Sequence, residues 1–293
     1  MDTPVVPFWG PPTSYLNFCE EDYVISRFVA EFINTFSSFV YICYGIYGLL
    51  HLRGKPQAAF RSISYLGLIG VGVCSAGYHM TLKYHTQMSD ELSMHLLTTP
   101  LLYRILTFQA TPKKTRIVGI ILSTLFTIVM VVHMVMDEFL LHAVSFGLAV
   151  YLIATRTLRI IPGQVKDVQL RGRLRRLSFL GVVCHLPPLV SDGLLMRFLA
   201  VCFGFGYFVW LIDEFGCQYL TQIRYATGVP VAFLFELHGW WHVFTAIGGY
   251  IAVAIVDLIT SGDVNKDPTN GLAWPVGTAM RLIKKGMEVK KEN

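Results

Sequence analysis

Long apolar segments recur along this chain of 293 residues and restrict what it can fold into. Each approaches or exceeds the roughly 18 residues that a helix needs to cross a bilayer. Only 15% of the residues are charged, whereas soluble domains contain about a quarter. We therefore predict an all-α polytopic membrane protein. The clearest spans cover residues 28–52, 62–82, 90–108, 117–136, 138–157 and 231–259.

The number of spans depends on two further apolar pieces, residues 174–190 and 194–211. If both crossed the membrane, there would be eight spans and the basic tail would lie on the other side. Lys and Arg concentrate in cytoplasmic loops, and here every second loop and the tail are basic. A seven-transmembrane-helix bundle with a lumenal N-terminus and a cytosolic C-terminus fits every loop. We therefore interpret residues 174–190, broken by Pro187-Pro188, as a re-entrant or interfacial piece.

The net charge of +5 arises in loops and in the tail, as in a membrane protein rather than a nucleic-acid-binding protein. Met1–Ser14 has no basic segment of the kind that begins a signal peptide, so we expect no cleaved leader. The six cysteines show no Cys-x-x-Cys spacing, and we interpret most of them as small core residues. They stand at positions 19, 43, 74, 184, 202 and 217.

Five residues that can carry chemistry stand at the predicted lumenal ends of three spans. His238 and His242 are four apart, so on a helix they project from one face and can share one metal ion. His79 can supply a third ligand, which leaves one zinc position open, the pattern of a catalytic site. Ser75 and Asp90 belong to the same depth. Polar groups at membrane depth usually mark function, so we predict a zinc hydrolase embedded in a membrane.

Each of these residues also has a simpler interpretation. Tryptophans beside His238 are ordinary at a membrane interface, Ser75 can be a small packing residue, and Asp90 can cap the third span. Asp213 and Trp241 are assigned to the surroundings of the site, where Asp213 can accept a hydrogen bond from a site histidine. The remaining histidines match no paired spacing and are interpreted as packing or loop residues. They are His51, His85, His95, His133, His142 and His185.

Oxygen-bearing side chains gather in the N-terminal segment and just after it. Asn17, Glu20, Asp22 and Glu31 can wrap a hard cation such as calcium. The glycine and the terminal glutamate of an EF-hand loop are missing, so the pattern alone also fits a solvated acidic segment.

Motifs distributed along most of the chain resemble the alkaline ceramidase family, within the CREST superfamily of seven-helix membrane hydrolases. The motifs are Trp9-Gly10-Pro11-x-Thr13-Ser14, Cys19-Glu20-Glu21-x-Tyr23, Ala30-Glu31-Phe32-x-Asn34-Thr35, Ser75-x3-His79-Met80-Thr81-Leu82-Lys83-Tyr84, Asp90-Glu91-Leu92 and His238-x-Trp240-Trp241-His242.

This resemblance implies zinc held by His79, His238 and His242, with Ser75 and Asp90 completing a site that hydrolyses the amide bond of ceramide to a sphingoid base and a fatty acid. It also implies a calcium site formed by five residues, one of which contributes its carbonyl. These are Asn17, Phe18 (carbonyl), Glu20, Asp22 and Glu31.

The calcium motif departs from the family pattern. The family commonly has Asp-Trp at the position of Asn17-Phe18, and Asn at the position of Asp22. A carbonyl ligand does not depend on its side chain, Asn17 still offers an oxygen and Asp22 restores a charge, so we expect calcium binding to survive.

The domain organisation follows from these assignments. Residues 1–27 form a lumenal segment with the calcium-site residues, 28–259 the transmembrane catalytic domain, and 260–293 a cytosolic basic tail. The last residues, Lys290-Lys291-Glu292-Asn293, resemble a dilysine signal for retrieval to the endoplasmic reticulum. We therefore expect a protein of the endoplasmic reticulum membrane, or of the Golgi, with ceramide as its lipid partner.

Two other functions remain compatible with the motifs: another membrane amidase of the same superfamily, and a seven-span receptor of the adiponectin-receptor type in which zinc is mainly structural. A lumenal N-terminus is opposite to the orientation of that receptor group and favours the ceramidase. The chain shows no inverted repeat and no paired broken helices, which argues against a transporter.

Overall fold

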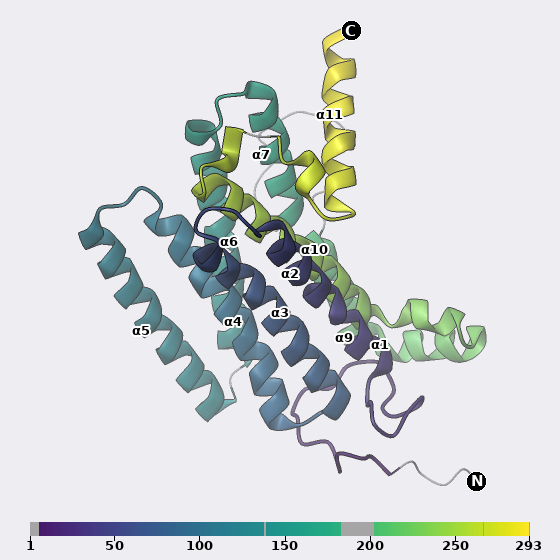
Figure 1. Ribbon diagram of the computed structural model, residues 1–293. Helices are drawn as coiled ribbons and strands as arrows, with labels where there is room; N and C mark the ends of the chain where they lie inside the picture. The colour runs from purple at the N-terminus through teal and green to yellow at the C-terminus, as the bar shows by residue number, and fades with distance from the viewer. Residues whose placement is uncertain (1–5, 138, 183–201, 266, 293) are drawn as a thin grey trace.

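The computed structural model describes residues 6–137, 139–182, 202–265 and 267–292, and its architecture is helical (Figure 1). Within these ranges the β-structure consists of an isolated bridge between Ser26 and Val29. The prediction of an all-α protein is confirmed. The α-helices are α1 (Phe32–Ser37), α2 (Phe39–His51), α3 (Ala58–Thr81), α4 (Tyr84–Thr107), α5 (Pro112–Met136), α6 (Phe139–Gln164), α7 (Val168–Val182), α9 (Cys202–Thr227), α10 (Leu237–Thr260) and α11 (Val276–Glu292).

Five helical segments of the described chain are long and apolar enough to cross a membrane, which confirms a polytopic membrane protein. Helix α4 is equally long, but Asp90, Glu91 and Arg104 lower its hydropathy. Helix α9, with Asp213, Glu214 and Arg224, is also long enough. The prediction of seven spans thus finds five clear spans and two more polar helices of spanning length, α4 and α9. The five segments are Phe32–His51, Ala58–Thr81, Pro112–Met136, Phe139–Gln164 and Leu237–Thr260.

Three predicted boundaries need correction. Helix α4 begins at Tyr84, so Asp90 lies in its second turn and the interpretation of Asp90 as a helix cap is wrong. Helix α6 continues to Gln164 and α7 follows it, so much of the predicted basic loop after residue 157 is helical. The sixth predicted span, residues 194–211, begins outside the described residues and continues as α9, which ends at Thr227. Of the proposed re-entrant piece, residues 174–182 belong to α7 and residues 183–190 lie outside the described residues.

The N-terminal segment is packed against one end of the helix bundle, the end opposite to α7 and α11 (Figure 1). The attachment centres on Leu82, which ends α3 in a left-handed conformation with φ 50° and is fully buried. Its carbonyl accepts hydrogen bonds from the backbone N–H groups of Thr13 and Ser14, at 2.9 and 3.1 Å. A disulfide between Cys19 and Cys217 also joins this segment to α9. The sequence shows no Cys-x-x-Cys spacing and did not indicate this pair.

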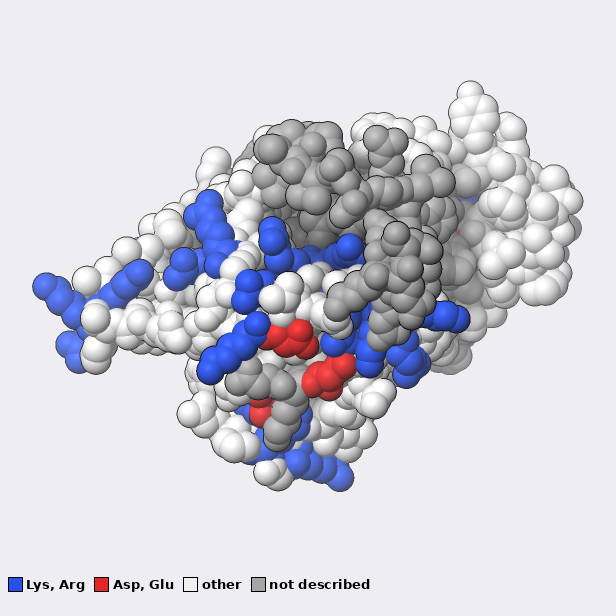
Figure 2. All heavy atoms as spheres, turned by 90° about the horizontal axis from the view of Figure 1, so that it is seen from above, with Lys and Arg blue, Asp and Glu red and all other residues white. Residues whose placement is uncertain are grey.

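Buried charges hold the other end of the bundle together. Asp257 of α10 pairs with Arg61 of α3 at 2.7 Å and with Arg104 of α4 at 2.8 Å, and all three side chains are buried. Lys and Arg spread over the face that Figure 2 shows, which is the face near α7 and α11. Charges confined in this way to the helix ends leave an apolar middle, as a bilayer requires.

A close approach of α2 and α3 positions two serines of the site. A Cβ atom on Gly72 would lie 2.8 Å from the carbonyl oxygen of Ser38, so this crossing requires glycine. One turn later, Ser75 of α3 lies with its Oγ 2.9 Å from the Oγ of Ser38. The crossing therefore brings the start of α2 to the place where α3 and α10 present their histidines.

Candidate metal centre

Three histidines from two helices meet at the bundle end that the N-terminal segment covers. His79 lies in the last turn of α3, and His238 and His242 lie in the first two turns of α10. One ligand atom from each lies within 4.8 Å of the others, and all three side chains are buried. The predicted spacing therefore produces a cluster that could hold a metal ion.

Neighbouring side chains orient two of the rings. The Nδ1 atom of His79 contacts the Glu31 carboxylate, and the Nδ1 atom of His242 lies 2.8 Å from the Ser37 hydroxyl. A ring that donates from Nδ1 keeps its Nε2 lone pair for a metal. His79 Nε2 is buried and has no hydrogen-bond partner, and neither has His238 Nδ1.

Such orphaned ring nitrogens are costly in a protein interior unless something binds them. Three converging imidazoles are also a donor set typical of zinc and similar transition ions. The residues present therefore fit the metal that the family resemblance implies.

Asp213 supports His238 in a different way from the one predicted. Its Oδ1 accepts from the backbone N–H of His238 at 3.2 Å, and its Oδ2 accepts from the backbone N–H of Cys19 at 3.0 Å. The carboxylate thus accepts from the main chain of a site histidine and not from its ring, because it satisfies a free N–H at the start of α10. The ring of His238 is stacked on Phe18, with centroids 3.6 Å apart.

Ser75 and Asp90 both line a cavity beside the histidines. Ser75 is buried, and its Oγ lies 3.4 Å from His242 Nε2. Asp90 faces the same cavity from α4. The sequence argument that placed these two residues at one depth with the histidines agrees with this arrangement, while their chemical roles remain predictions.

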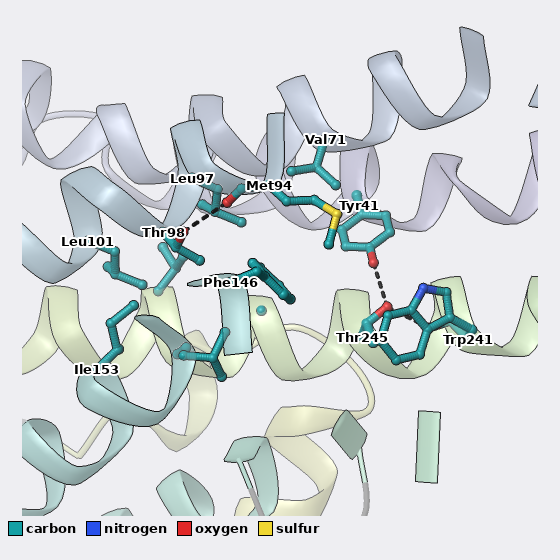
Figure 3. Close-up of a pocket in the computed structure, with 14 residues that line it drawn as sticks. Tyr41, Val71, Met94, Leu97, Thr98, Leu101, Phe146, Ile153, Trp241 and Thr245 are labelled. Carbon is teal, nitrogen blue, oxygen red and sulfur yellow. Dashed lines mark hydrogen bonds between the residues drawn. The ribbon is translucent and has the colours of Figure 1, made fainter. Parts of the chain in front are cut away.

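The cavity has a volume of about 560 Å³ and a polar end at His238, His242, Ser75 and Asp90. Its remaining walls are mainly apolar and come from the N-terminal segment, α2, α3, α4, α6, α9 and α10, and Trp241 is part of them. A narrower pocket of about 50 Å³ adjoins it deeper in the bundle (Figure 3). The two share several wall residues, so apolar space continues from the polar end into the bundle. The shared residues are Tyr41, Val71, Met94, Phe146, Val150 and Trp241.

The acidic residues of the N-terminal segment fold onto the same end. Glu20 accepts from the backbone N–H groups of Ile33 and Asn34 at 2.7 and 2.8 Å, which caps the start of α1. Asp22 Oδ1 is buried without a hydrogen-bond partner. Burial raises the pKa of Glu20 to about 7 and that of Asp22 to about 6. Carboxylates buried so close together favour a cation between them.

Glu31 takes part in both clusters. It is fully buried, and its Oε1 accepts from the backbone N–H of Phe18 at 3.3 Å while its Oε2 contacts both His79 Nδ1 and the Asn34 amide. The sequence pointed to Glu31 only as a cation ligand. Asn17 lies at the exposed edge of this group, where its Oδ1 accepts from the Phe18 N–H at 3.0 Å.

The structure corrects the interpretation of His133 and His142 as isolated packing residues. They gather with Glu91 as a second buried group of possible metal ligands, and His95 lies beside His142. A usable signal was present in the sequence, because His133 stands at the end of the predicted span 117–136 and His142 at the start of the span 138–157, on the same predicted side of the membrane as Asp90. His51 instead stacks on Tyr47 and His85 is exposed, while His185 lies outside the described residues.

Comparisons with known proteins identify the family. Residues 10–283 match the family model described as Ceramidase. The chain is 30% identical over 250 residues to alkaline ceramidase 3 of Mus musculus, which covers 84% of each chain. It is 27% identical to alkaline ceramidase YPC1 of Saccharomyces cerevisiae, covering 95% of this chain and 86% of the relative. It is 26% identical to alkaline ceramidase 1 of Mus musculus, covering 84% and 81%. The chain therefore belongs to the ceramidase family.

Proposed function

We propose that this protein hydrolyses the amide bond of ceramide to a sphingoid base and a fatty acid. The observation that carries the proposal is the position of the His79, His238 and His242 cluster at the polar end of a largely apolar cavity. A lipid amide needs such a site, because its polar bond must reach the catalytic groups while its chains remain in apolar surroundings. The names of the relatives point to the same substrate.

The three histidines would hold zinc. Zinc bound there would supply Lewis-acid activation of the amide carbonyl and of water. The chain supplies the orientation of these ligands, since Glu31 and Ser37 fix the rings of His79 and His242. Phe18 covers His238 from the side of the N-terminal segment and excludes water from that face.

Asp90 and Ser75 would carry the proton transfer and the charge stabilisation. Asp90 lines the cavity at its polar end, where its carboxylate can orient the attacking water, take its proton and return a proton to the leaving amine. The Ser75 hydroxyl can donate to the carbonyl oxygen as that atom becomes negative. The Ser38 hydroxyl, 2.9 Å away, holds Ser75 in place.

Replacing one histidine tests the metal and the activity together. His238→Ala should lose the bound zinc and lower kcat/KM for ceramide by more than about 100-fold, because even the outer partners of metal ligands contribute about 10- to 100-fold. Zinc content and release of the sphingoid base are measured on purified protein in detergent. His51→Ala is the matched control, since His51 stacks on Tyr47 in α2, away from the cluster. Activity retained in His238→Ala contradicts the proposal, whereas zinc without any ceramide hydrolysis in the wild type favours a receptor.

The acyl chain of the substrate would extend into the deeper pocket of Figure 3. This pocket lies between Trp241 and Tyr41 on one side and Leu101 and Ile153 on the other, and the small residues Gly249 and Ala252 of α10 form part of its wall. Its walls are largely apolar, and each CH₂ group buried there contributes about 0.8 kcal/mol.

Filling this pocket should shorten the acyl chain that the enzyme accepts. Ala252→Leu should lower kcat/KM for a long-acyl ceramide by about 10-fold relative to a short-acyl ceramide, because about two CH₂ groups lose their place. Ala254→Leu is the matched control, since Ala254 lines a different cavity on the same helix. Equal losses for both substrates in Ala252→Leu would place the acyl chain elsewhere.

The N-terminal acidic group would bind calcium through Asn17, the Phe18 carbonyl, Glu20, Asp22 and Glu31. Support comes from the burial of Glu20 and Glu31 and from the unpartnered Asp22 oxygen. Oxygen atoms of carboxylate, amide and carbonyl groups are the ligands that calcium prefers.

Calcium should therefore stabilise the fold. At about 100 times its Kd, calcium adds about 2.7 kcal/mol to the free energy of unfolding, which should raise the thermal unfolding temperature in detergent by several degrees. Asp22→Ala should lose most of this rise, because it removes the unpartnered oxygen. Glu21→Gln should keep the rise in unfolding temperature, since Glu21 is exposed and accepts a hydrogen bond from the Tyr225 hydroxyl instead. A calcium response that is equal in the two variants contradicts the site.

The active end of the bundle would face the lumen of the endoplasmic reticulum. The disulfide between Cys19 and Cys217 lies at this end, and disulfides persist in oxidising compartments. The basic face of Figure 2 lies at the other end, as expected for a cytosolic surface. A cytosolic C-terminus would also present Lys290-Lys291 to the retrieval machinery.

This orientation predicts the protease sensitivity of terminal tags in sealed microsomes. A tag before residue 1 should be protected, and a tag after residue 293 should be digested, because only the cytosolic side is accessible to added protease. Detergent should expose both tags. Digestion of the N-terminal tag in intact microsomes would reverse the proposed orientation.

A further inference from the structure

A second buried group of metal-ligating side chains lies apart from the histidine cluster. Glu91 of α4, His133 of α5 and His142 of α6 place one ligand atom each within 4.8 Å of the others. All three side chains are buried. Helices α5 and α6 contribute nothing to the first cluster, which comes from α3 and α10.

We propose that Glu91, His133 and His142 bind a second divalent transition ion of the zinc type. Two imidazoles and one carboxylate form a donor set that zinc uses in proteins. The carboxylate offsets part of the charge of the ion, which matters where water is scarce. The fourth coordination position can open to the cavity, because Glu91 and His142 both line it.

Hydrogen bonding within the group does not account for all of its polar atoms. The carboxylate of Glu91 contacts His133 Nε2 and accepts from Gln87 Nε2 at 2.9 Å. His142 Nδ1, however, is buried and has no hydrogen-bond partner. The ring of His142 stacks on that of His133 with centroids 5.2 Å apart, so its nitrogen is held close to the Glu91–His133 pair. An ion bound by all three residues would give this nitrogen a partner, which the hydrogen bonds of the group do not provide.

Residues around Glu91 hold it in the orientation that a ligand needs. Gln87, one turn earlier on α4, is fully buried and donates to the Glu91 Oε1. The Tyr15 hydroxyl from the N-terminal segment lies 3.4 Å from the same oxygen. Outer contacts of this kind are what fix carboxylate ligands around metals.

The ion would fasten α5 to the rest of the bundle. Helix α5 stands at the outside of the bundle in Figure 1, and Met130 and His133 are its only buried residues. His133 therefore provides the polar anchor of this helix. Because Glu91 follows Asp90 on α4, an ion at Glu91 would also fix the turn of α4 that carries Asp90 into the cavity.

Zinc content of the full-length protein in detergent tests the proposal. The protein is loaded with excess Zn²⁺ in the presence of calcium, freed of unbound metal, and analysed for zinc per chain by mass spectrometry. We expect two ions in the wild type, and one in each of His142→Gln, Glu91→Gln and His238→Ala. His142→Gln combined with His238→Ala should retain none.

His95→Gln is the matched control. His95 is buried beside His142, with ring centroids 4.9 Å apart, but its Nε2 is already 2.9 Å from the Ser145 hydroxyl. This variant should keep both ions. A variant that still binds the ion of the first cluster must be folded. The loss of the other ion then shows that the substituted residue is one of its ligands.

Zinc content equal to that of the wild type in both His142→Gln and Glu91→Gln overturns the proposal. If His142→Gln does not fold, Glu91→Gln and His133→Asn provide the same comparison. The result is independent of the first cluster, because loss of zinc in His142→Gln but not in His238→Ala would support this site while contradicting the zinc proposed for catalysis.

Discussion

The contact between the Glu31 carboxylate and the His79 ring joins the two parts of the site. Glu31 lies at the start of α1 and is fully buried, so each of its oxygens needs a partner. The partners come from three regions: His79 at the end of α3, the backbone N–H of Phe18 and the side chain of Asn34. The N-terminal segment must therefore close over the bundle for the carboxylate to be satisfied. In the same position, Phe18 stacks on His238.

The bilayer imposes a broader constraint, because polar groups must gather at the helix ends or pair inside the bundle. The chain does both. The histidine cluster, Asp90 and the Glu91 group occupy one end, and the Arg61, Arg104 and Asp257 network occupies the other. By the rise of about 1.5 Å per residue, Arg61 and His79 on α3 are about 27 Å apart. The largely apolar cavity that begins at the first end thus lies among helices secured at both of their ends.

The sequence allowed the main features of the site to be predicted because they depend on local periodicity. The four-residue spacing of His238 and His242 places both on one face of any helix, and helix ends at equal depth must meet. Apolar runs likewise revealed α3, α5, α6 and α10. The start of helix α4 was harder to predict. The helix begins at Tyr84, but the polar residues of its first turns placed the predicted start at Asp90. The turns between Tyr84 and Asp90 carry mainly polar side chains near the site, so a hydropathy pattern does not detect them.

Contacts between distant segments could not be predicted in this way. Cys19 and Cys217 are 198 residues apart, and no local pattern pairs them. Asp213 was assigned to the surroundings of the site, but only the fold shows that it accepts from backbone N–H groups of His238 and Cys19. Each case depends on where the N-terminal segment lies against α9 and α10.

Glu31 belongs both to the proposed calcium ligands and to the surroundings of His79. This gives a physical reason for the calcium ligands to lie next to the histidine cluster. A carboxylate that accepts from His79 Nδ1 leaves the Nε2 lone pair free to bind a metal, and it does so only while it is ionised. Burial opposes that ionisation. Burial also raises the pKa of Glu20 and Asp22, and the charge of Glu31 raises both further. A calcium ion among these carboxylates, where we propose one, would reverse the balance and keep Glu31 negative. The N-terminal segment would thus act on the metal centre through electrostatics, besides contributing Leu16 and Phe18 to the cavity wall.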